Sequence, residues 1–262
     1  MRYVLHSMRM LLKSATQYRA SFVMQTIGQL VMTGGDLMAV LVLMNRFAHA
    51  GQWSGDEILM FFGVMQLSFA LTECFGRGIS SFSSLVGSGD FDSLLLRPRG
   101  LLLQTVCTRL DPRRWITAAV GLAALGAASA RLGLAWTARR IALLLFSVMG
   151  SVLLLLGLFL IEATACFFSI RSIEAVNVLT YGGRQTCQYP VDLYPGPLKT
   201  LFTWVAPFAL CMHLPVSYLL GKPLFPVSPA LVAASPLTGF AFFGIMTQVW
   251  RMGVRHYRST GS

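Results

Sequence analysis

The run Ile141–Ile161 holds no charged residue, and it limits more than any other feature what this chain can fold into. About 20 mostly apolar residues are enough for a helix to cross the hydrocarbon core of a bilayer. Inside lipid every backbone polar group needs a partner, and a helix supplies these partners internally. Over the whole chain 12% of residues are charged and 55% are hydrophobic, whereas a soluble domain carries about 25% charged residues. The sequence therefore predicts an all-α integral membrane protein and excludes a soluble enzyme.

Hydropathy along the 262 residues predicts about six transmembrane helices in one domain. The first span is predicted to be interrupted at Thr33–Asp36, and the third is rich in Ala and Gly, which favours close packing between helices. Hydropathy favours Leu201–Leu220 as the fifth span, although Pro207 and Pro215 lie within it. The predicted spans are Phe22–Met44, Ile58–Ile79, Trp115–Leu134, Ile141–Ile161, Leu201–Leu220 and Pro229–Trp250.

The net charge of +11 fits the loops of a membrane protein, because cytoplasmic loops collect Lys and Arg. Several arginines surround the loop between the second and third spans, and basic residues also close the chain. We therefore predict that this loop and both termini are cytoplasmic. One group does not follow the preference of basic residues for cytoplasmic loops. In the predicted topology Arg131, Arg139 and Arg140 would lie on the outer side of the membrane. Nucleic acid is not a predicted partner, because no basic stretch is interleaved with aromatic residues.

Residues 1–20 have the pattern of a helix that lies in the membrane interface, with apolar residues on one face and basic residues between them. A simple basic flank is an equal alternative, and both place this end in the cytoplasm. The segment has no apolar central region and no clear cleavage site, so we predict no cleavable signal peptide.

The chain lacks the motifs of common catalytic and metal sites. It has no G-x-x-x-x-G-K-[ST] loop for a nucleoside triphosphate, no H-E-x-x-H and no G-x-S-x-G. Its four histidines are scattered, and none of its five cysteines belongs to a C-x-x-C pair. We therefore predict no catalytic residue, no metal site and no cofactor on this chain.

The polar loop Gly87–Gly100 is predicted to contain a short helix. Asp90 is of a type that caps helix N-termini, and Pro98 disfavours the helical conformation of the residue before it. The predicted helix is therefore Asp90–Arg97. Its apolar face either docks in a groove of another protein or packs on its own bundle. That face, set by helical spacing, carries Phe91, Leu94 and Leu95.

The same loop carries a family resemblance. Its pattern G-x-x-D-x-L-L-L-R-P, within Gly87–Pro98, resembles the signature of bacterial ABC-type permeases of the type-2 export class. That class includes viologen and multidrug exporter permeases. Together with the other matches, the resemblance spans most of the chain. The further matches are Tyr189-Pro190, Pro207, Pro215 and the ending Trp250–Ser262.

This resemblance implies a permease that pairs with a second permease subunit and with a separate ATPase subunit, which would hold the ATP and magnesium. The implied cargo is a small hydrophobic or cationic compound that leaves across the bacterial inner membrane. The resemblance also implies a second arrangement, with Ser172–Gln188 as the fifth span and residues 189–222 as a re-entrant hairpin on the outer side. The loop helix would be the coupling helix in an ATPase groove, with Asp90, Phe91, Asp92, Leu94, Leu95 and Arg97 as its contact residues.

Polar side chains inside the predicted spans are candidates for the translocation path, because such groups are costly in a membrane and usually functional. Glu73 and Arg77 are four residues apart and are predicted to pair on one helix face. One alternative function is an ion-coupled secondary transporter with a proton site at Asp36 or Glu162, although no inverted repeat is visible. Another is a membrane scaffold without transport. The path candidates are Asp36, Gln25, Gln29, Gln66 and Glu162.

Overall fold

The computed structural model of the chain describes residues 19–46, 49–98, 100–167, 174, 176–222 and 227–257. Nearly all of the predicted interfacial segment, residues 1–20, and the end of the basic tail lie outside these ranges. The described chain is helical except for one two-stranded antiparallel ribbon. Its elements are α2 (Arg19–Arg46), β1 (His49–Ala50), β2 (Trp53–Ser54), α3 (Gly55–Ser80), α4 (Phe82–Gly87), α5 (Asp90–Leu95), α6 (Leu101–Val106), α7 (Arg114–Arg131), α8 (Ala138–Ala165), η1 (Val178–Gly182), α10 (Gly183–Cys187), η2 (Val191–Leu193), α11 (Gly196–Thr200), η3 (Leu201–Val205), η4 (Ala209–His213), α12 (Leu214–Leu219), α13 (Pro229–Ala234) and α14 (Leu237–Arg255).

Four helical stretches are long and apolar enough to cross a membrane: α2, α3 with α4, α8, and α13 with α14. They correspond to the predicted first, second, fourth and last spans and confirm an all-α membrane protein. The predicted third span is α7, which has 18 residues and falls outside this group because an arginine at each end makes it less apolar. The predicted interruption of the first span is wrong, since α2 runs without a break through Gly34 and Gly35.

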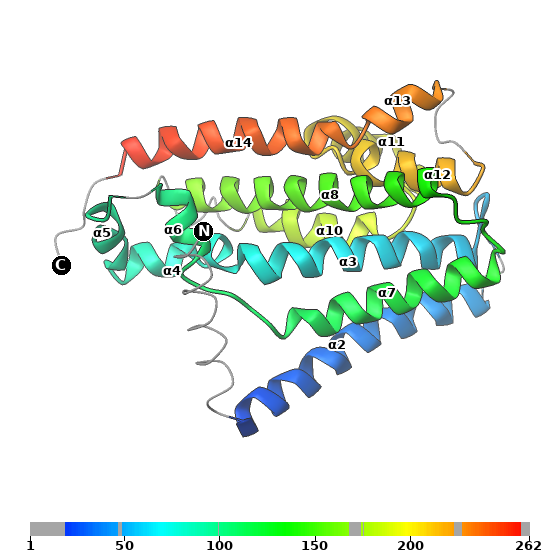
Figure 1. The fold of residues 1–262 in the computed structure, drawn as a ribbon, viewed down its shortest axis with the longest axis horizontal. Helices are drawn as coiled ribbons and strands as arrows, with labels where there is room; N and C mark the ends of the chain where they lie inside the picture. The colour runs from blue at the N-terminus through cyan, green and yellow to red at the C-terminus, as the bar shows by residue number, and fades with distance from the viewer. Residues whose placement is uncertain are drawn as a thin grey trace.

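The helices α3, α7, α8 and α14 lie side by side along the long axis of the molecule (Figure 1). Glycines set how closely they approach one another. A Cβ added at Gly63 of α3 would lie 2.9 Å from the carbonyl oxygen of Gly121 in α7, and one added at Gly239 of α14 would overlap the carbonyl oxygen of Gly150 in α8. The close packing predicted for the Ala- and Gly-rich third span is therefore present.

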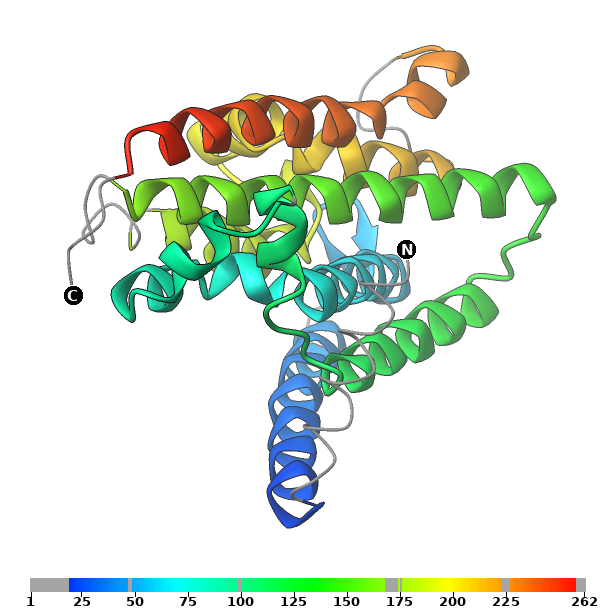
Figure 2. The same cartoon turned by 60° about the vertical axis from the view of Figure 1, so that its left-hand side comes forward.

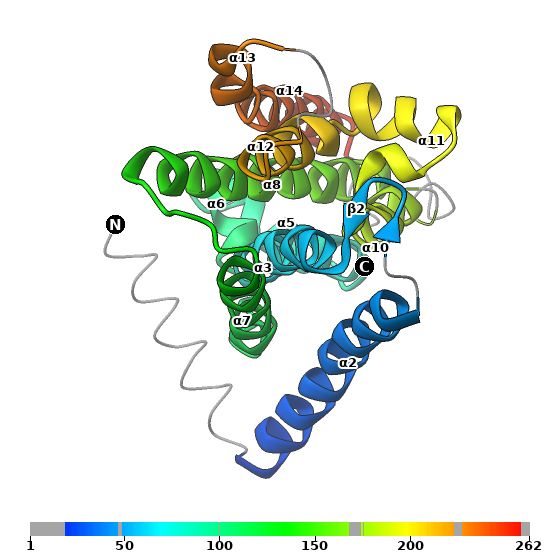
Figure 3. The same ribbon diagram turned by 90° about the vertical axis from the view of Figure 1, so that its right-hand side faces the viewer.

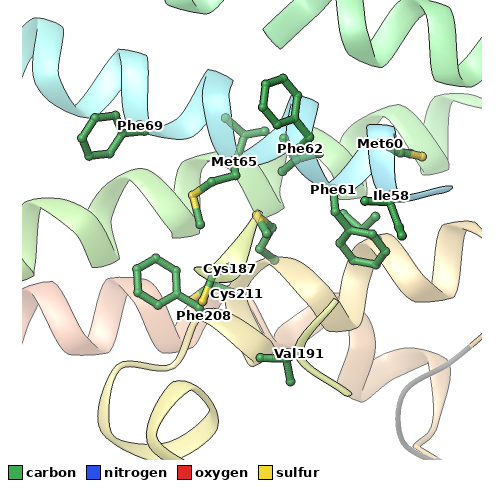
Figure 4. Close-up of a cluster of buried hydrophobic side chains, with 14 of the residues drawn as sticks. Ile58, Met60, Phe61, Phe62, Met65, Phe69, Cys187, Val191, Phe208 and Cys211 are labelled. Carbon is green, nitrogen blue, oxygen red and sulfur yellow. The ribbon is translucent and has the colours of Figure 1, made fainter. Parts of the chain in front are cut away.

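The centre of the bundle is α3, which buries apolar side chains on all sides, as expected of a helix inside a larger core. Figure 4 shows Phe61 and Met65 of α3 facing a second group of side chains from the segments after α8, while Phe62 points to the opposite side of α3. Cys187 and Phe208 belong to that second group and are fully buried. By contrast, α2 leaves the bundle and exposes most of its apolar side chains (Figures 2 and 3).

The segment 189–222 begins and ends at the same end of the bundle, beside the β1–β2 ribbon. Near its start, Trp53 Nε1 donates to both carboxylate oxygens of Asp192 at 2.9 Å. At its end, Lys222 Nζ donates to Glu57 Oε2 and to the carbonyl oxygen of Gln52, both at 2.8 Å. Between these anchors two helical parts meet at an angle of 82°. Leu201–Leu220 is therefore a bent pair of helices rather than one straight helix.

Candidate functional site

The loop helix forms at the predicted place, but it is shorter than predicted. It is α5, which ends at Leu95, and its N-cap is Gly89 rather than Asp90. Gly89 has φ 76°, a left-handed conformation that glycine adopts without strain, so the chain turns sharply into the helix. Asp90 is the first helical residue and accepts a hydrogen bond of 2.7 Å from Ser88 Oγ. Its negative charge lies at the positive end of the helix dipole.

One face of α5 is buried in an aromatic cluster of this chain. Phe91 is fully buried, with its ring centroid 5.0 Å from that of Phe82, 4.9 Å from that of Tyr257 and 6.0 Å from that of Phe167. Tyr257 Oη also donates to Asp92 Oδ1 at 3.1 Å. The helix is thus attached to α4, to the end of α8 and to the chain that follows α14.

This packing matches, for Phe91 and Leu94, the second of the two predicted alternatives, in which the apolar face packs on its own bundle. Phe91 and Leu94 are buried against their own bundle, because the ends of α8 and α14 supply partners that no local pattern reveals. Leu95 is 42% exposed, and the next residue, Leu96, is 87% exposed. The loop therefore presents a different apolar surface, Leu95 and Leu96, flanked by the exposed side chains of Asp90, Ser93 and Arg97.

A second candidate region is a set of polar contacts that joins three helices inside the bundle. Arg184 of α10 lies 2.8 Å from the carboxylate of Asp36 in α2 and donates at 3.0 Å to Gln66 Oε1 in α3. Its guanidinium also lies 4.6 Å from the ring centroid of Phe69. The structure thus brings together two predicted path residues, Asp36 and Gln66, through an arginine that the sequence did not single out.

Nearer the α5 end, Glu73 is the centre of a buried ionic cluster. The predicted pair with Arg77 is present at 3.3 Å, and Arg114 of α7 approaches the other carboxylate oxygen at 2.6 Å. Tyr181 Oη donates to Glu73 at 3.4 Å. Arg114 also lies 3.7 Å from Asp111, which pairs with a neighbouring arginine. A buried carboxylate is stable only when it is paired and hydrogen-bonded in this way.

Two of the other predicted path residues border the Glu73 cluster: Gln25 through Arg113, and Glu162 through Arg77 and Tyr181. Gln29 donates to Thr117 at 3.0 Å, and Gln25 accepts a hydrogen bond from Arg113. Glu162 in α8 is buried, and the amide of Asn177, oriented so that its nitrogen donates, lies 3.2 Å and 3.3 Å from its two carboxylate oxygens.

The described residues contain no cluster of three or more His, Cys, Asp or Glu side chains that could hold a metal ion. The site is instead a helical loop, attached to its bundle on one face and exposed on the other, beside helices that carry buried ion pairs. Comparison with protein-family models matches residues 30–261 to the family described as ABC-2 family transporter protein. No curated protein and no solved structure matches the chain. Because the match covers most of its length, this chain belongs to the ABC-2 family of transporter proteins.

Proposed function

We propose that this chain is the permease subunit of an ATP-driven exporter in a bacterial inner membrane. The family supports a transmembrane subunit that is not itself the ATPase. The sequence agrees, because it has no loop for a nucleoside triphosphate. ATP and magnesium are then held by a separate ATPase subunit, and the end that carries α5 and the last residues of α14 faces the cytoplasm.

The observation that carries this proposal is that one face of α5 is buried in its own bundle while the opposite face is exposed. Phe91 joins it to three parts of the bundle, while Leu95 and Leu96 are exposed at 42% and 87%. A helix attached in this way passes an outside movement to α4, α8 and the end of α14 together. The permease has two conformations in this proposal. Binding of ATP to the ATPase subunit shifts the balance between them only if the ATPase contacts α5 more favourably in one conformation than in the other.

The position of helix α2, away from the bundle, is an argument that it moves during transport and that it contacts a second permease subunit. Its apolar side chains are mostly exposed. It is held to the bundle by the pair Asp36–Arg184, by polar contacts of Gln25, Gln29 and Thr33, and by the buried side chain of Val40. Exposed apolar surface of this extent meets lipid or another apolar protein surface. We infer that α2 faces the second permease subunit across the path, whose cargo is a small hydrophobic or cationic compound.

The anchors of residues 189–222 support the re-entrant arrangement that the family resemblance implied. Both ends of the segment are held at the ribbon end, opposite α5. In this proposal residues 174–188 complete the fifth crossing, and the bent pair enters from the outer side and returns to it. The chain then crosses six times, with α7 as the third crossing.

The proposal is tested by capture of the ATPase subunit on the purified full chain. Replacing Leu95 and Leu96 together with Asp should weaken capture by roughly thirtyfold, because the loss of an interface anchor costs about 2 kcal/mol or more. Leu193→Asp is the matched control, since Leu193 is exposed at the other end. Capture of the double variant at the level of the control would contradict an ATPase contact at α5.

A second pair of variants distinguishes binding of the ATPase subunit from transmission of its movement to the bundle. Phe91→Ala should keep ATPase capture but lower transport per ATP hydrolysed, because it loosens the attachment of α5 while leaving its outer face intact. Tyr257→Phe keeps the ring and removes only the hydroxyl that donates to Asp92, so it tests the same attachment with a smaller effect on folding. Unchanged transport per ATP in both variants would contradict transmission through this cluster.

A further inference from the structure

A cavity of about 860 Å³ is lined by the first turns of α8, the end of α12 and α13. Figure 1 shows these elements at the end of the bundle opposite α5. The lining of the cavity combines small and aromatic apolar side chains, among them Ala142, Phe146 and Ala233, with the two arginines Arg139 and Arg140. None of the residues that line it belongs to α5 or to the loop around it. The combination of apolar and basic side chains in this cavity is therefore not explained by the proposed contact between α5 and the ATPase.

The two arginines are exposed and make this end of the cavity positively charged. They lie in the first turn of the 28-residue helix α8, which holds no acidic residue in that turn and has its positive dipole end there. No ion pair between described residues involves either arginine, and neither Asp nor Glu lines the cavity. Arg140 Nη1 donates only to a neutral partner, the carbonyl oxygen of Ala135, at 3.0 Å.

The surroundings indicate that the anion is part of an amphiphile. Trp136, which is 38% exposed, stands just before α8, and tryptophan favours the boundary between lipid and water. The first turn of α8 then lies at headgroup level, with Phe146 deeper along the helix toward the hydrocarbon. A free inorganic anion would gain nothing from such an apolar wall, whereas an acyl chain would bury surface against it.

We propose that this cavity binds an anionic phospholipid of the leaflet at that end, with its phosphate between Arg139 and Arg140 and an acyl chain along Phe146 and Ala233. Basic pockets between transmembrane helices recognise anionic headgroups in this way. The proposal also accounts for arginines that the charge bias of membrane loops would place on the other side.

The test is thermal unfolding of the purified full chain in detergent, with phosphatidylglycerol or phosphatidylcholine added in increasing amounts. Phosphatidylglycerol should raise the unfolding temperature of the parent, because a ligand that binds only the folded state stabilises it. Replacing Arg139 and Arg140 together with Gln should weaken that response by roughly thirtyfold, at about one kcal/mol for each charge. Arg131→Gln is the matched control, because Arg131 is 61% exposed nearby and pairs with Asp56 outside the cavity.

A second variant tests the apolar wall. Ala233→Trp should fill the space for the acyl chain and abolish the response, while Ala127→Trp, on an exposed face of α7, should keep it. An equal response of the parent and the Arg139 and Arg140 double variant would overturn the proposal. An equal response of the parent to inorganic phosphate would overturn it too, because it would show an anion site without a lipid.

Discussion

At the scale of single residues, Arg184 has the most consequential position in the bundle. It supplies the positive charge beside Asp36 and also contacts Gln66 and Phe69, so one side chain connects α2 with α3 and α10. The pair therefore ties the middle of α2 to the rest of the bundle.

Asp36→Asn should therefore lower both the unfolding temperature and export. The change leaves the charge of Arg184 without its counter-ion, and the cost is up to about 3 kcal/mol because both side chains keep partial exposure. Adding Arg184→Gln should recover much of the stability. Asp56→Asn is the control, since its pair with Arg131 is largely exposed and is worth about 1 kcal/mol or less. If Asp36→Asn unfolds and exports like the control, the pair has no such role.

The polar residues show which pairs can be predicted from sequence. Glu73 and Arg77 lie four apart on one helix, so their pairing follows from helical geometry. Asp36 and Arg184 are separated by 148 residues, and only the packed bundle brings them together. The same limit applies to Phe91 in the loop helix. Its helical spacing was visible, but its aromatic partners at the ends of α8 and α14 were not.

At the scale of elements, α8 and α14 pack so closely that they behave as one unit. Their contact has no side chain between Gly150 and Gly239. Gly239→Val should force the two helices apart and lower stability by about 1–3 kcal/mol, the usual cost of overpacking. Gly244→Val, on the same helix with nothing within 4 Å of an added Cβ, is the control for helix propensity. Thermal unfolding in detergent compares them, and equal unfolding temperatures would contradict a glycine contact at this seam.

Comparison of the elements with the sequence shows which membrane spans hydropathy can predict. Long apolar runs became α2, α3, α8 and α14 because such a run has few other ways to satisfy its backbone in lipid. Residues 189–222 could not be assigned in this way. Their apolar stretch has the composition of a span, but Pro207 lies at the bend, and the anchors at Trp53 and Glu57 are far away in sequence.

At the scale of the whole molecule, the two ends of the bundle differ in a way that labelling can test. In a chain without its native cysteines, Leu193→Cys and Val227→Cys should both react with an impermeant reagent from the outer side. These positions flank the bent pair, so they share a side only if the segment re-enters. Leu96→Cys should react only from the cytoplasmic side. Labelling of Leu193→Cys and Val227→Cys from opposite sides would show that the bent pair crosses the membrane.

The β1–β2 ribbon has a consequence for the order in which the chain is made. Trp53 precedes Asp192 by 139 residues, and Glu57 precedes Lys222 by 165 residues. During synthesis the ribbon and the capped start of α3 therefore emerge long before the segment that they hold. They supply the hydrogen-bond partners that hold both ends of residues 189–222. Residues 189–222 can therefore take their place only after more than half of the chain has been made.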